Sequence, residues 1–487
     1  MKLNHLLKGV EAVAVKGDRY LEITGIYYDS KQLKNGGLFF AIKGSNKNGL
    51  EFIDEAIERG AVCVVCEDDF ITFKNVCKIK VKDVRKACAV IANNFYQSPS
   101  SKVSVVGITG TNGKTTILYL IEAILQQAGR DCGTIGTISY KVGERNIPAV
   151  NTTPSAIMIQ MLLHDMQSAN IPYCAMEISS HSIHQHRVYG VKIDSAIFTN
   201  LSGEHLDYHK DMEEYFKVKK SLFDGLREDA QAIVNADNDY GNRIVSDTKA
   251  KILRYAINSD ADVKAVNIKY SIKGTYFKAI TPYGELDIRT ELIGEYNIYN
   301  ILAAITFALS KGTEARDVEE AVKKFRGAPG RLQRVDRGQD FSVFIDYAHT
   351  DDALANVLNA LKKLTKKRII AVFGCGGDRD KQKRPRMGRV AAELADFVVI
   401  TSDNPRGENP KSIIEDIVKG LPDGFKDYKV SLDRKKAINL SLSMAEDDDI
   451  VLIAGKGHEK YQVLKDTTIA FDDLMMATEM LESKDVT

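Results

Sequence analysis

This sequence has almost no excess of either positive or negative charge. In 487 residues, 67 Lys and Arg are balanced by 66 Asp and Glu, so the net charge is +1. Nucleic acids and membrane surfaces attract proteins with surplus Lys and Arg, and we therefore expect neither as a partner. The balance is compatible with a local basic pocket for phosphate groups.

Long apolar runs and paired cysteine motifs are also missing. The start of the chain, Met1 to His5, leads into no apolar signal segment, and no run approaches the length that spans a bilayer. Cys63 and Cys66 form a lone C-x-x-C inside the apolar run 61–66, which is typical of a buried strand rather than of a zinc or redox site. We expect a cytoplasmic monomer without membrane insertion.

Short β-branched runs alternate with helical patterns along most of the chain, without internal repeats. This alternation favours an α/β protein with parallel sheets covered by helices. The strand-like runs are 103–108, 368–373, 397–401 and 450–454, and helical spacing is found at 116–127 and about 387–394.

The length exceeds what one hydrophobic core supports, which indicates several domains. The polar stretch 96–101 precedes a new strand, and the small-residue stretch 327–331 precedes another α/β unit. We predict three domains, with bounds 1–100, 101–330 and 331–487.

A glycine-rich segment, 107–116, lies between a predicted strand and a predicted helix. Its glycines allow backbone N–H groups to face phosphate oxygens, the helix N-terminus and Lys114 add positive charge, and Thr115 can offer its hydroxyl to Mg²⁺. Ile108 stands where the standard phosphate-loop spacing requires glycine. In this loop Gly110, three residues before Gly113, supplies a glycine instead. A turn without ligand is the alternative. The order of strand, loop, Lys-Thr-Thr and helix favours a nucleotide triphosphate site.

A phosphate loop alone is compatible with kinases, motors, switches and ligases. The segment 111–116 resembles the ATP loop of the Mur ligases and their folylpolyglutamate synthetase relatives. The segments 177–181 and 200–209 follow predicted strands in the family's order. Taken singly, Glu177 could be a helix N-terminal charge and His205 a surface histidine; the resemblance implies that both are Mg²⁺ ligands.

The segment 215–220 resembles the family segment in which a lysine is carbamylated. Lys219 stands at the matching position, and the resemblance implies that its carbamate is a further Mg²⁺ ligand. The alternative is a solvated cluster formed by Lys217, Lys219 and Lys220. The resemblance thus implies Lys114, Lys219 and His205 as catalytic residues, and Thr115, Glu177, His205 and Lys219 as the metal site.

The resemblance runs through the whole chain and implies the architecture. A small N-terminal α/β domain binds a uridine nucleotide, a central phosphate-loop ATPase-like parallel sheet binds ATP, and a C-terminal Rossmann-like domain binds the amino acid. Asn297 and Asn300 could otherwise be plain helix-start residues, and Asp351 departs from the proline of most members. The implied ATP contacts are Gly110, Thr111, Asn112, Gly113, Lys114, Thr115, Thr116, Asn297, Asn300, Arg331, Asp346 and His349.

Within the family, the chain is most similar to members that add the third amino acid of a nucleotide-linked cell-wall peptide. The segments 28–30, 44–49 and 151–154 carry this similarity, although Ser45-Asn46-Lys47 is not the commonest triplet. The implied contacts to UDP-N-acetylmuramoyl-L-alanyl-D-glutamate are Tyr28, Ser30, Ser45, Asn46, Lys47, Asn151, Thr152, Thr153, Ser179, Gln185 and Arg187.

The tetrapeptide Asp403-Asn404-Pro405-Arg406 resembles that of members that take meso-diaminopimelate, whereas lysine-adding members usually lack the arginine. Diaminopimelate carries a second carboxylate that a guanidinium stabilises, and lysine does not. A plain turn after a strand is the alternative reading. The implied diaminopimelate contacts are Arg379, Asp403, Asn404, Pro405, Arg406, Gly455 and Glu459.

The implied reaction uses ATP and Mg²⁺ to activate the D-glutamate side-chain carboxylate as an acyl phosphate, which the amine of diaminopimelate then attacks. The base for that amine is not assigned; His205 and His349 are candidates. Because the ATP loop and the amino-acid site lie in different predicted domains, we expect domain closure with Gly330 at the hinge. The alternatives are a lysine-adding ligase, a folylpolyglutamate synthetase and a protein that uses ATP hydrolysis as a switch.

Overall fold

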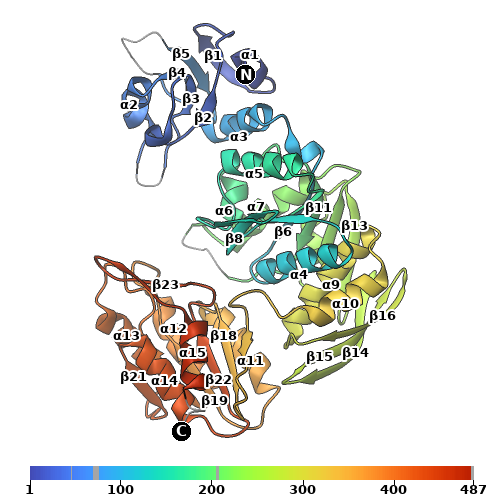
Figure 1. The fold of residues 1–487 in the computed structure, drawn as a ribbon, viewed down its shortest axis with the longest axis vertical. Helices are drawn as coiled ribbons and strands as arrows, with labels where there is room; N and C mark the ends of the chain where they lie inside the picture. The colour runs from blue at the N-terminus through green and yellow to red at the C-terminus, as the bar shows by residue number, and fades with distance from the viewer. Residues whose placement is uncertain (45–46, 70–75, 204–207, 484–487) are drawn as a thin grey trace. The chain divides into compact units, whose positions relative to one another are not determined.

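The computed structural model describes residues 1–44, 47–69, 76–203 and 208–483 (Figure 1). They form two compact units, of which the first comprises Met1–Lys114, Leu125–Leu201 and Asp211–Arg254 and the second Thr115–Ile124, Ser202–Lys210 and Tyr255–Thr487. No helix among the described residues is both long and apolar enough to cross a membrane.

The first unit begins with a five-stranded sheet in the order β1-β5-β4-β3-β2, parallel except for β1. Both faces are apolar: Phe40 and Cys63 pack toward α3, while Phe39 and Val64 pack toward α2. The elements are α1 (Leu3–Leu6), β1 (Ala12–Lys16), β2 (Gly25–Tyr27), β3 (Gly37–Phe40), α2 (Ile53–Glu58), β4 (Ala61–Cys66), β5 (Cys77–Val81) and α3 (Val84–Phe95).

The first unit also contains a sheet in the order β13-β12-β11-β6-β10-β7-β8-β9. Its central strand β6 pairs in parallel with β10 and with β11, so the carboxyl ends of these three strands meet at one edge. The elements are β6 (Ser104–Thr109), α4 (Lys114–Gln127), β7 (Cys132–Ile135), β8 (Ser139–Val142), β9 (Arg145–Pro148), α5 (Ala156–Ser168), β10 (Tyr173–Glu177), α6 (Ser180–His184), β11 (Ile193–Phe198), α7 (Met212–Asp224), β12 (Gln231–Asn235), α8 (Gly241–Ile244) and β13 (Lys251–Ala256).

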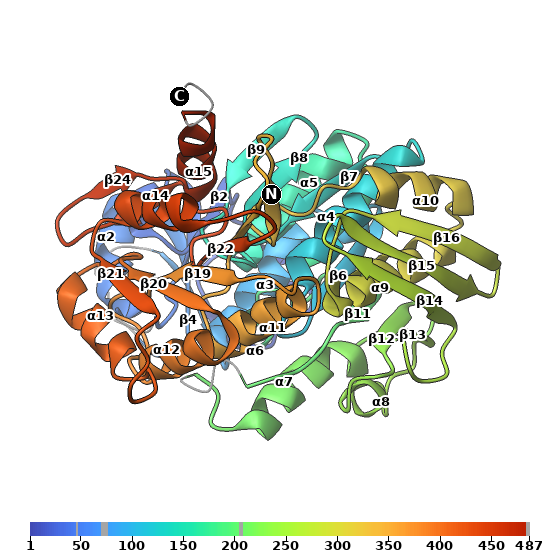
Figure 2. The same ribbon diagram turned by 90° about the horizontal axis from the view of Figure 1, so that it is seen from below.

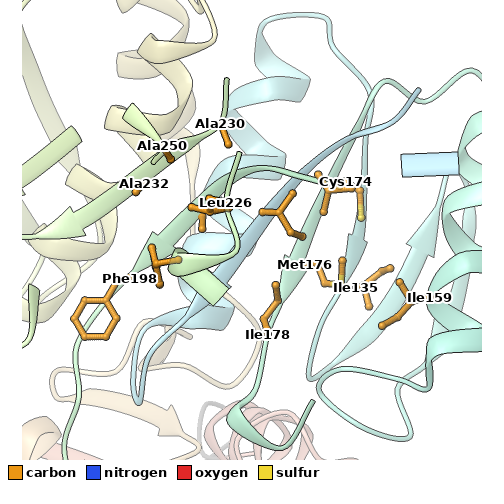
Figure 3. Packing of buried hydrophobic residues seen from close by; sticks show 14 of the residues in the cluster. Ile135, Ile159, Cys174, Met176, Ile178, Phe198, Leu226, Ala230, Ala232 and Ala250 are labelled. Carbon is orange, nitrogen blue, oxygen red and sulfur yellow. The ribbon is translucent and has the colours of Figure 1, made fainter. Parts of the chain in front are cut away.

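The core of this sheet is continuous across its strands. Figure 3 shows Cys174 and Met176 of β10 beside Ile135 of β7 and Ile159 of α5, all fully buried. Strands that are apolar on both faces are expected in a parallel sheet covered by helices.

In the second unit, β14 pairs in parallel with the end of β13 at Tyr255 and continues into an antiparallel meander with β15 and β16. The helix α9 that follows is buried almost throughout, as its apolar residues on all sides require. The elements are β14 (Val263–Ser271), β15 (Gly274–Thr281), β16 (Gly284–Thr290), α9 (Glu295–Ser310) and α10 (Ala315–Lys324).

The second unit ends with a six-stranded sheet in the order β17-β18-β22-β19-β20-β21, parallel except for β17. Helices α11 to α13 cover one face, and α14 and α15 cover the other (Figure 2). The elements are β17 (Gln333–Val335), β18 (Ser342–Asp346), α11 (Asp351–Lys362), β19 (Ile369–Phe373), α12 (Lys383–Leu394), β20 (Phe397–Thr401), α13 (Pro410–Val418), β21 (Tyr428–Ser431), α14 (Arg434–Met444), β22 (Ile450–Ala454), β23 (Tyr461–Val463), β24 (Thr468–Ala470) and α15 (Asp473–Glu482).

The α/β class expected from the alternating pattern is confirmed, with mostly parallel sheets covered by helices. The boundaries expected at 100/101 and 330/331 both fall outside regular strands and α-helices, and the division into three domains stays a prediction. One helix begins earlier than expected, since α12 starts at Lys383 rather than near Met387.

Candidate functional site

The glycine-rich segment forms the loop between β6 and α4. Gly110 has φ +144° and Gly113 has φ +90°, a region that side chains rarely adopt. A Cβ atom at Gly110 would lie 1.9 Å from Oγ1 of Thr199, which follows β11. The departure from the standard glycine spacing therefore has a physical reason, because this loop must pass close to the end of a neighbouring strand.

Asn200 clamps the loop from the end of β11. Its carbonyl oxygen accepts from the N–H of Thr111 at 2.9 Å, and its Oδ1 accepts from the N–H of Asn112 at 3.0 Å. Thr199 donates from Oγ1 to the carbonyl oxygen of Asn112 at 2.7 Å. We did not predict Asn200 as a site residue, although its place at the head of the 200–209 segment was a usable signal.

Lys114 turns back onto this loop. Its Nζ donates to the carbonyl oxygens of Gly110 at 2.9 Å and Thr111 at 2.6 Å. Thr115 and Thr116 follow in the first turn of α4, and both are buried. The loop thus concentrates a cation and hydroxyl groups at a helix N-terminus, which is chemistry suited to phosphate.

Lys219 reaches the same loop from α7. Its side chain is only 1% exposed, and Nζ donates to the carbonyl oxygen of Gly110 at 3.2 Å and to Oγ1 of Thr109 at 3.4 Å. Lys217 is exposed, and Lys220 pairs with Asp224 and Asp247. The solvated-cluster alternative is therefore wrong for Lys219, while carbamylation stays a prediction.

Glu177 ends β10, next to β6, and its side chain is fully buried. Oε1 accepts from the N–H of Thr137 at 2.9 Å, and Oε2 accepts from the hydroxyl of Thr137 at 3.0 Å. Thr137 is a further residue that we did not predict. His205, the other expected metal ligand of this region, lies outside the described residues. Carboxylate and hydroxyl oxygens are suitable ligands for Mg²⁺, so the side-chain chemistry of Glu177, and separately that of Thr115, suits the expected ion.

Four of the expected acceptor contacts form one cluster beside Glu177. Thr153 donates from Oγ1 to the carbonyl oxygen of Glu177 at 2.8 Å and accepts from the N–H of Ser179 at 3.0 Å. Arg187 donates from Nη1 to the carbonyl oxygen of Thr153 at 2.8 Å and from Nη2 to Oε1 of Gln185 at 2.7 Å. The structure therefore brings Thr153, Ser179, Gln185 and Arg187 together.

Asn151 and Thr152, two further expected acceptor contacts, directly precede Thr153 in the chain. Tyr140 donates its hydroxyl to the carbonyl oxygen of Asn151 at 2.6 Å, and the hydroxyl oxygens of Thr137 and Thr152 lie within hydrogen-bond distance, at 3.1 Å. Thr137 thus contacts both Glu177 and Thr152, which links an expected metal ligand to an expected acceptor contact.

The expected contacts in the N-terminal sheet are more scattered. Ser30 is buried and donates its hydroxyl to Oε2 of Glu55 at 2.8 Å, whereas Tyr28 is half exposed. The Nζ atom of Lys47 lies 5.6 Å from the centre of the Phe52 ring. Ser45 and Asn46 are outside the described residues.

In the second unit, Asp346 at the end of β18 organises the expected ATP contacts of the C-terminal domain. Its carboxylate accepts from the N–H groups of Leu332 at 2.6 Å and Ala348 at 2.7 Å. Burial raises the pKa of Asp346, although the Arg331 guanidinium and the two N–H groups oppose the shift. Arg331 lies with its guanidinium 4.8 Å from the centre of the Tyr347 ring.

Two histidines flank the same tyrosine. The rings of His349 and His458 lie 4.7 Å and 4.9 Å from the ring of Tyr347, and Nδ1 of His349 is 2.8 Å from the carbonyl oxygen of Tyr347. Burial, with the nearby cation of Arg331, lowers the pKa of His458 to about 4. This histidine is therefore neutral near pH 7.

Asn297 and Asn300 are buried in the first turns of α9. Asn297 donates from Nδ2 to the carbonyl oxygen of Ile293 at 2.8 Å, and Asn300 donates from Nδ2 to Oδ1 of Asn297 at 3.1 Å. These bonds suit helix-start residues, so an adenine contact for this pair stays a prediction.

The loops after β20 and β22, which carry most of the expected diaminopimelate contacts, are joined by Asn404. This side chain is buried, donates from Nδ2 to Oε2 of Glu459 at 2.8 Å, and accepts on Oδ1 from the N–H of Val463 at 2.9 Å. Lys456 is fully buried and donates from Nζ to Oδ1 of Asn404 at 3.2 Å and to Glu459 at 3.1 Å. These bonds tie the segment to a second loop, and its role in binding an amino acid rather than forming a plain turn stays a prediction. We did not predict Lys456.

The loop after β19 is fastened to the loop after β20. Arg406 has φ +51° and donates from Nη1 to the carbonyl oxygen of Gly377 at 2.9 Å. A Cβ atom at Gly377 would lie 1.9 Å from the carbonyl oxygen of Pro405, so the two loops touch through their backbones. Arg379 is exposed, and a Cβ atom at Gly455, which has φ +112°, would lie 3.8 Å from Oδ2 of Asp403.

A buried arginine that we did not predict, Arg384, connects the loops after β19 and β20 through Glu408. Arg384 donates to both carboxylate oxygens of Glu408, at 2.8 Å and 3.0 Å, and Glu408 accepts from the N–H of Asp378 at 2.6 Å. The Arg384 guanidinium lowers the pKa of Glu408 to about 2. The loops are thus held by charge as well as by backbone contacts.

Comparison with known proteins gives three family matches along the chain. The Mur ligase family catalytic domain matches residues 22–96, the Mur ligase middle domain matches 108–308, and the Mur ligase glutamate ligase domain matches 330–457. Together they span most of the chain.

Two curated relatives carry the same name, UDP-N-acetylmuramoyl-L-alanyl-D-glutamate--2,6-diaminopimelate ligase. The enzyme of Caldanaerobacter subterraneus is 44% identical over 481 residues, and ligase 1 of Clostridium acetobutylicum is 42% identical over 484 residues. Each alignment covers 99% of both chains. A solved structure of a ligase with this name matches at 30% identity with a TM-score of 0.72 and covers 100% of both chains.

Proposed function

The chain belongs to the Mur ligase family, and on this premise we propose that it joins meso-2,6-diaminopimelate to UDP-N-acetylmuramoyl-L-alanyl-D-glutamate. Relatives named for this ligation align over nearly the whole chain. The enzyme is an ATP-dependent, amide-forming ligase of peptidoglycan synthesis. Its cytoplasmic location and monomeric state are further parts of the proposal.

The observation that supports the proposal most directly is the arrangement at the carboxyl ends of β6 and β10. Lys114 and Lys219 both contact Gly110 in the phosphate loop. Glu177, one strand away, leads directly into the Thr153–Ser179 cluster. The loop proposed for ATP and the cluster proposed for the acceptor therefore lie next to each other within one compact unit, as phosphoryl transfer from ATP to the acceptor requires.

In the proposed reaction, an oxygen of the D-glutamate side-chain carboxylate attacks the γ-phosphorus of ATP, and ADP leaves. Lys114 offers positive charge to the transferred phosphoryl group, and the N–H groups that follow Asn112 in the loop orient it. Glu177 and Thr115 would hold Mg²⁺, which when bound neutralises phosphate charge. Arg187 and Ser179 would orient the acceptor, because a guanidinium can donate two parallel hydrogen bonds to an anionic group.

In the second step, an amine of diaminopimelate attacks the acyl carbon, and phosphate leaves as the amide forms. We assign Arg406 and Arg379 to the distal carboxylate of the amino acid. Lysine lacks this group, so its binding would leave the two guanidinium groups without a carboxylate to pair with. Asp403, Asn404, Pro405, Gly455 and Glu459 complete the proposed amino-acid site.

A phosphate-release assay tests the proposal. The enzyme is supplied with ATP, Mg²⁺ and the UDP-muramoyl-dipeptide, and meso-diaminopimelate is compared with L-lysine and other diamino acids. We expect phosphate release and a tripeptide product, identified by mass, with diaminopimelate only. Equal incorporation of lysine would replace the amino-acid assignment, and turnover with a folate instead of the UDP-dipeptide would replace the acceptor assignment.

A further inference from the structure

A fully buried ion pair lies beneath the loops of the proposed amino-acid site. Arg434 begins α14 and Asp473 begins α15, and both side chains are 0% exposed. Arg434 donates from Nε to Oδ1 of Asp473 at 2.7 Å and from Nη2 to Oδ2 at 2.6 Å. This two-point geometry fixes the plane of the guanidinium.

The remaining donors of Arg434 reach two strand ends. Nη2 donates to the carbonyl oxygen of Ala454 at 3.0 Å, and Nη1 donates to the carbonyl oxygen of Ser402 at 3.4 Å. Ala454 ends β22 and Ser402 directly follows β20, and these two strands are separated in the sheet by β19. One side chain therefore bridges two strands that do not hydrogen-bond to each other.

Each of these carbonyl groups directly precedes a loop of the proposed site. Ser402 leads into the 403–406 tetrapeptide, and Ala454 leads into the 455–459 segment. At their tips the same loops are joined by the bond from Asn404 to Glu459. The distance between the two loops is thus held at two places. Asn404 joins the loops themselves, and Arg434 joins the two carbonyl groups that directly precede them.

Stability alone does not account for this pair. A cation at a helix N-terminus is opposed by the helix dipole, and a buried ion pair contributes little net stability against well-packed apolar side chains. Lysine in place of arginine would keep the charge but could not hold the carboxylate with two parallel bonds and also reach both carbonyl oxygens.

We propose that Arg434, oriented by Asp473, is a positioning residue that fixes the spacing between the two loops that receive the diamino acid. The inference rests on the proposed function, because it assigns the amino acid to these loops. A displacement of either loop moves the groups assigned to the substrate, and small misplacements of such groups are costly for binding and turnover.

A second Arg–Asp pair in the same sheet, whose arginine is part-exposed, provides a control. Arg368 and Asp449 directly precede β19 and β22, at the opposite ends of the strands, and Arg368 donates from Nη2 to Oδ2 of Asp449 at 2.6 Å. Asp449 is buried, and Arg368 also donates to the carbonyl oxygen of Met444. This pair resembles the first in chemistry but lies at the edge away from the loops.

The test uses the full-length chain in three variants: Arg434→Lys, the double variant Arg434→Met/Asp473→Leu, and the control Arg368→Met/Asp449→Leu. KM values for diaminopimelate, ATP and the UDP-dipeptide are measured by phosphate release, with the melting temperature of each variant. We expect both Arg434 variants to raise the KM for diaminopimelate about 10-fold or more. The KM for ATP, and all KM values of the control, should stay within about two-fold.

Three results would overturn the inference: an unchanged KM for diaminopimelate in both Arg434 variants, an equal rise in the control, or failure of Arg434→Lys to fold. The last result would assign the pair to folding. Assays of the unmodified chain distinguish failure of this inference from failure of the proposed function. If it turns over another amino acid instead of diaminopimelate, the KM for that amino acid decides whether Arg434 positions the loops.

Discussion

A Cβ atom at Gly330 would lie 2.1 Å from the backbone nitrogen of His458. Gly330 also has φ +66°, so residue 330 must be glycine both for its backbone conformation and for the space around it. The proposed hinge is therefore pressed against the 455–459 segment that carries proposed substrate contacts.

This contact predicts that Gly330→Ala destabilises the chain more than a glycine replacement in open space. Gly338, with φ +87° and no atom near its Cβ position, is the matched control. We expect Gly338→Ala to cost about 1–2 kcal/mol for the left-handed backbone alone, and Gly330→Ala to cost about 1–3 kcal/mol more. Urea unfolding of the two variants measures the difference, and equal costs would contradict it.

Lys114 is expected to be essential for turnover. Because its Nζ lies at the loop and carries the full positive charge there, Lys114→Met should lower kcat about 100-fold or more. Lys102→Met, an exposed lysine just before β6, should keep kcat within about two-fold. Phosphate release with all three substrates gives both values; a Lys114 variant with normal kcat would exclude this role.

Lys219 is expected to act as its carbamate. Lys219→Ala should be nearly inactive and partly restored by a short-chain carboxylate, and removal of bicarbonate should slow the unmodified enzyme. The exposed Lys217 supplies the control, since Lys217→Ala keeps the helix and the charge at residue 219. Full activity of Lys219→Ala without any added carboxylate would show that no carbamate is needed.

Arg406 is expected to set the choice of amino acid. Arg406→Ala should raise the KM for diaminopimelate about 30-fold or more, because it removes the cation assigned to the distal carboxylate. The relative rate with lysine should rise, whereas Arg389→Ala, an exposed arginine on α12, should leave both unchanged. Competition between the two amino acids, with products separated by mass, makes the measurement. Unaltered selectivity of the Arg406 variant would refute the assignment.

Glu408 is expected to make stability depend on acidic pH. Its pKa in the folded chain is lowered from 4.5 to about 2 by Arg384, so its contribution is present above about pH 4.5 and lost as the pH falls toward about 2. The difference in free energy of unfolding between the unmodified chain and Glu408→Gln should therefore shrink over that range. Glu415→Gln, on the exposed face of α13, should show no such trend. A constant difference for Glu408→Gln would count against the ion pair.

Local patterns sufficed for the strands, the phosphate loop and the position of Glu177 at a strand end. The early start of α12 was not predicted, because 383–386 are polar and carry no apolar periodicity, and Pro385 is tolerated only because it lies in the first turn. Distant partners were also missed. Arg434 meets Asp473 39 residues away, and Asn112 meets Asn200 88 residues away, through packing that periodicity does not encode.

The bond from Asn404 to Glu459 spans 55 residues of sequence and makes two separate segments act as one recognition surface. Directed evolution toward a different amino acid would then gain little from a library confined to 403–406. Each altered tetrapeptide would still have to fit against the unaltered 455–459 segment. Recombining both segments in a single library is the design that this linkage favours.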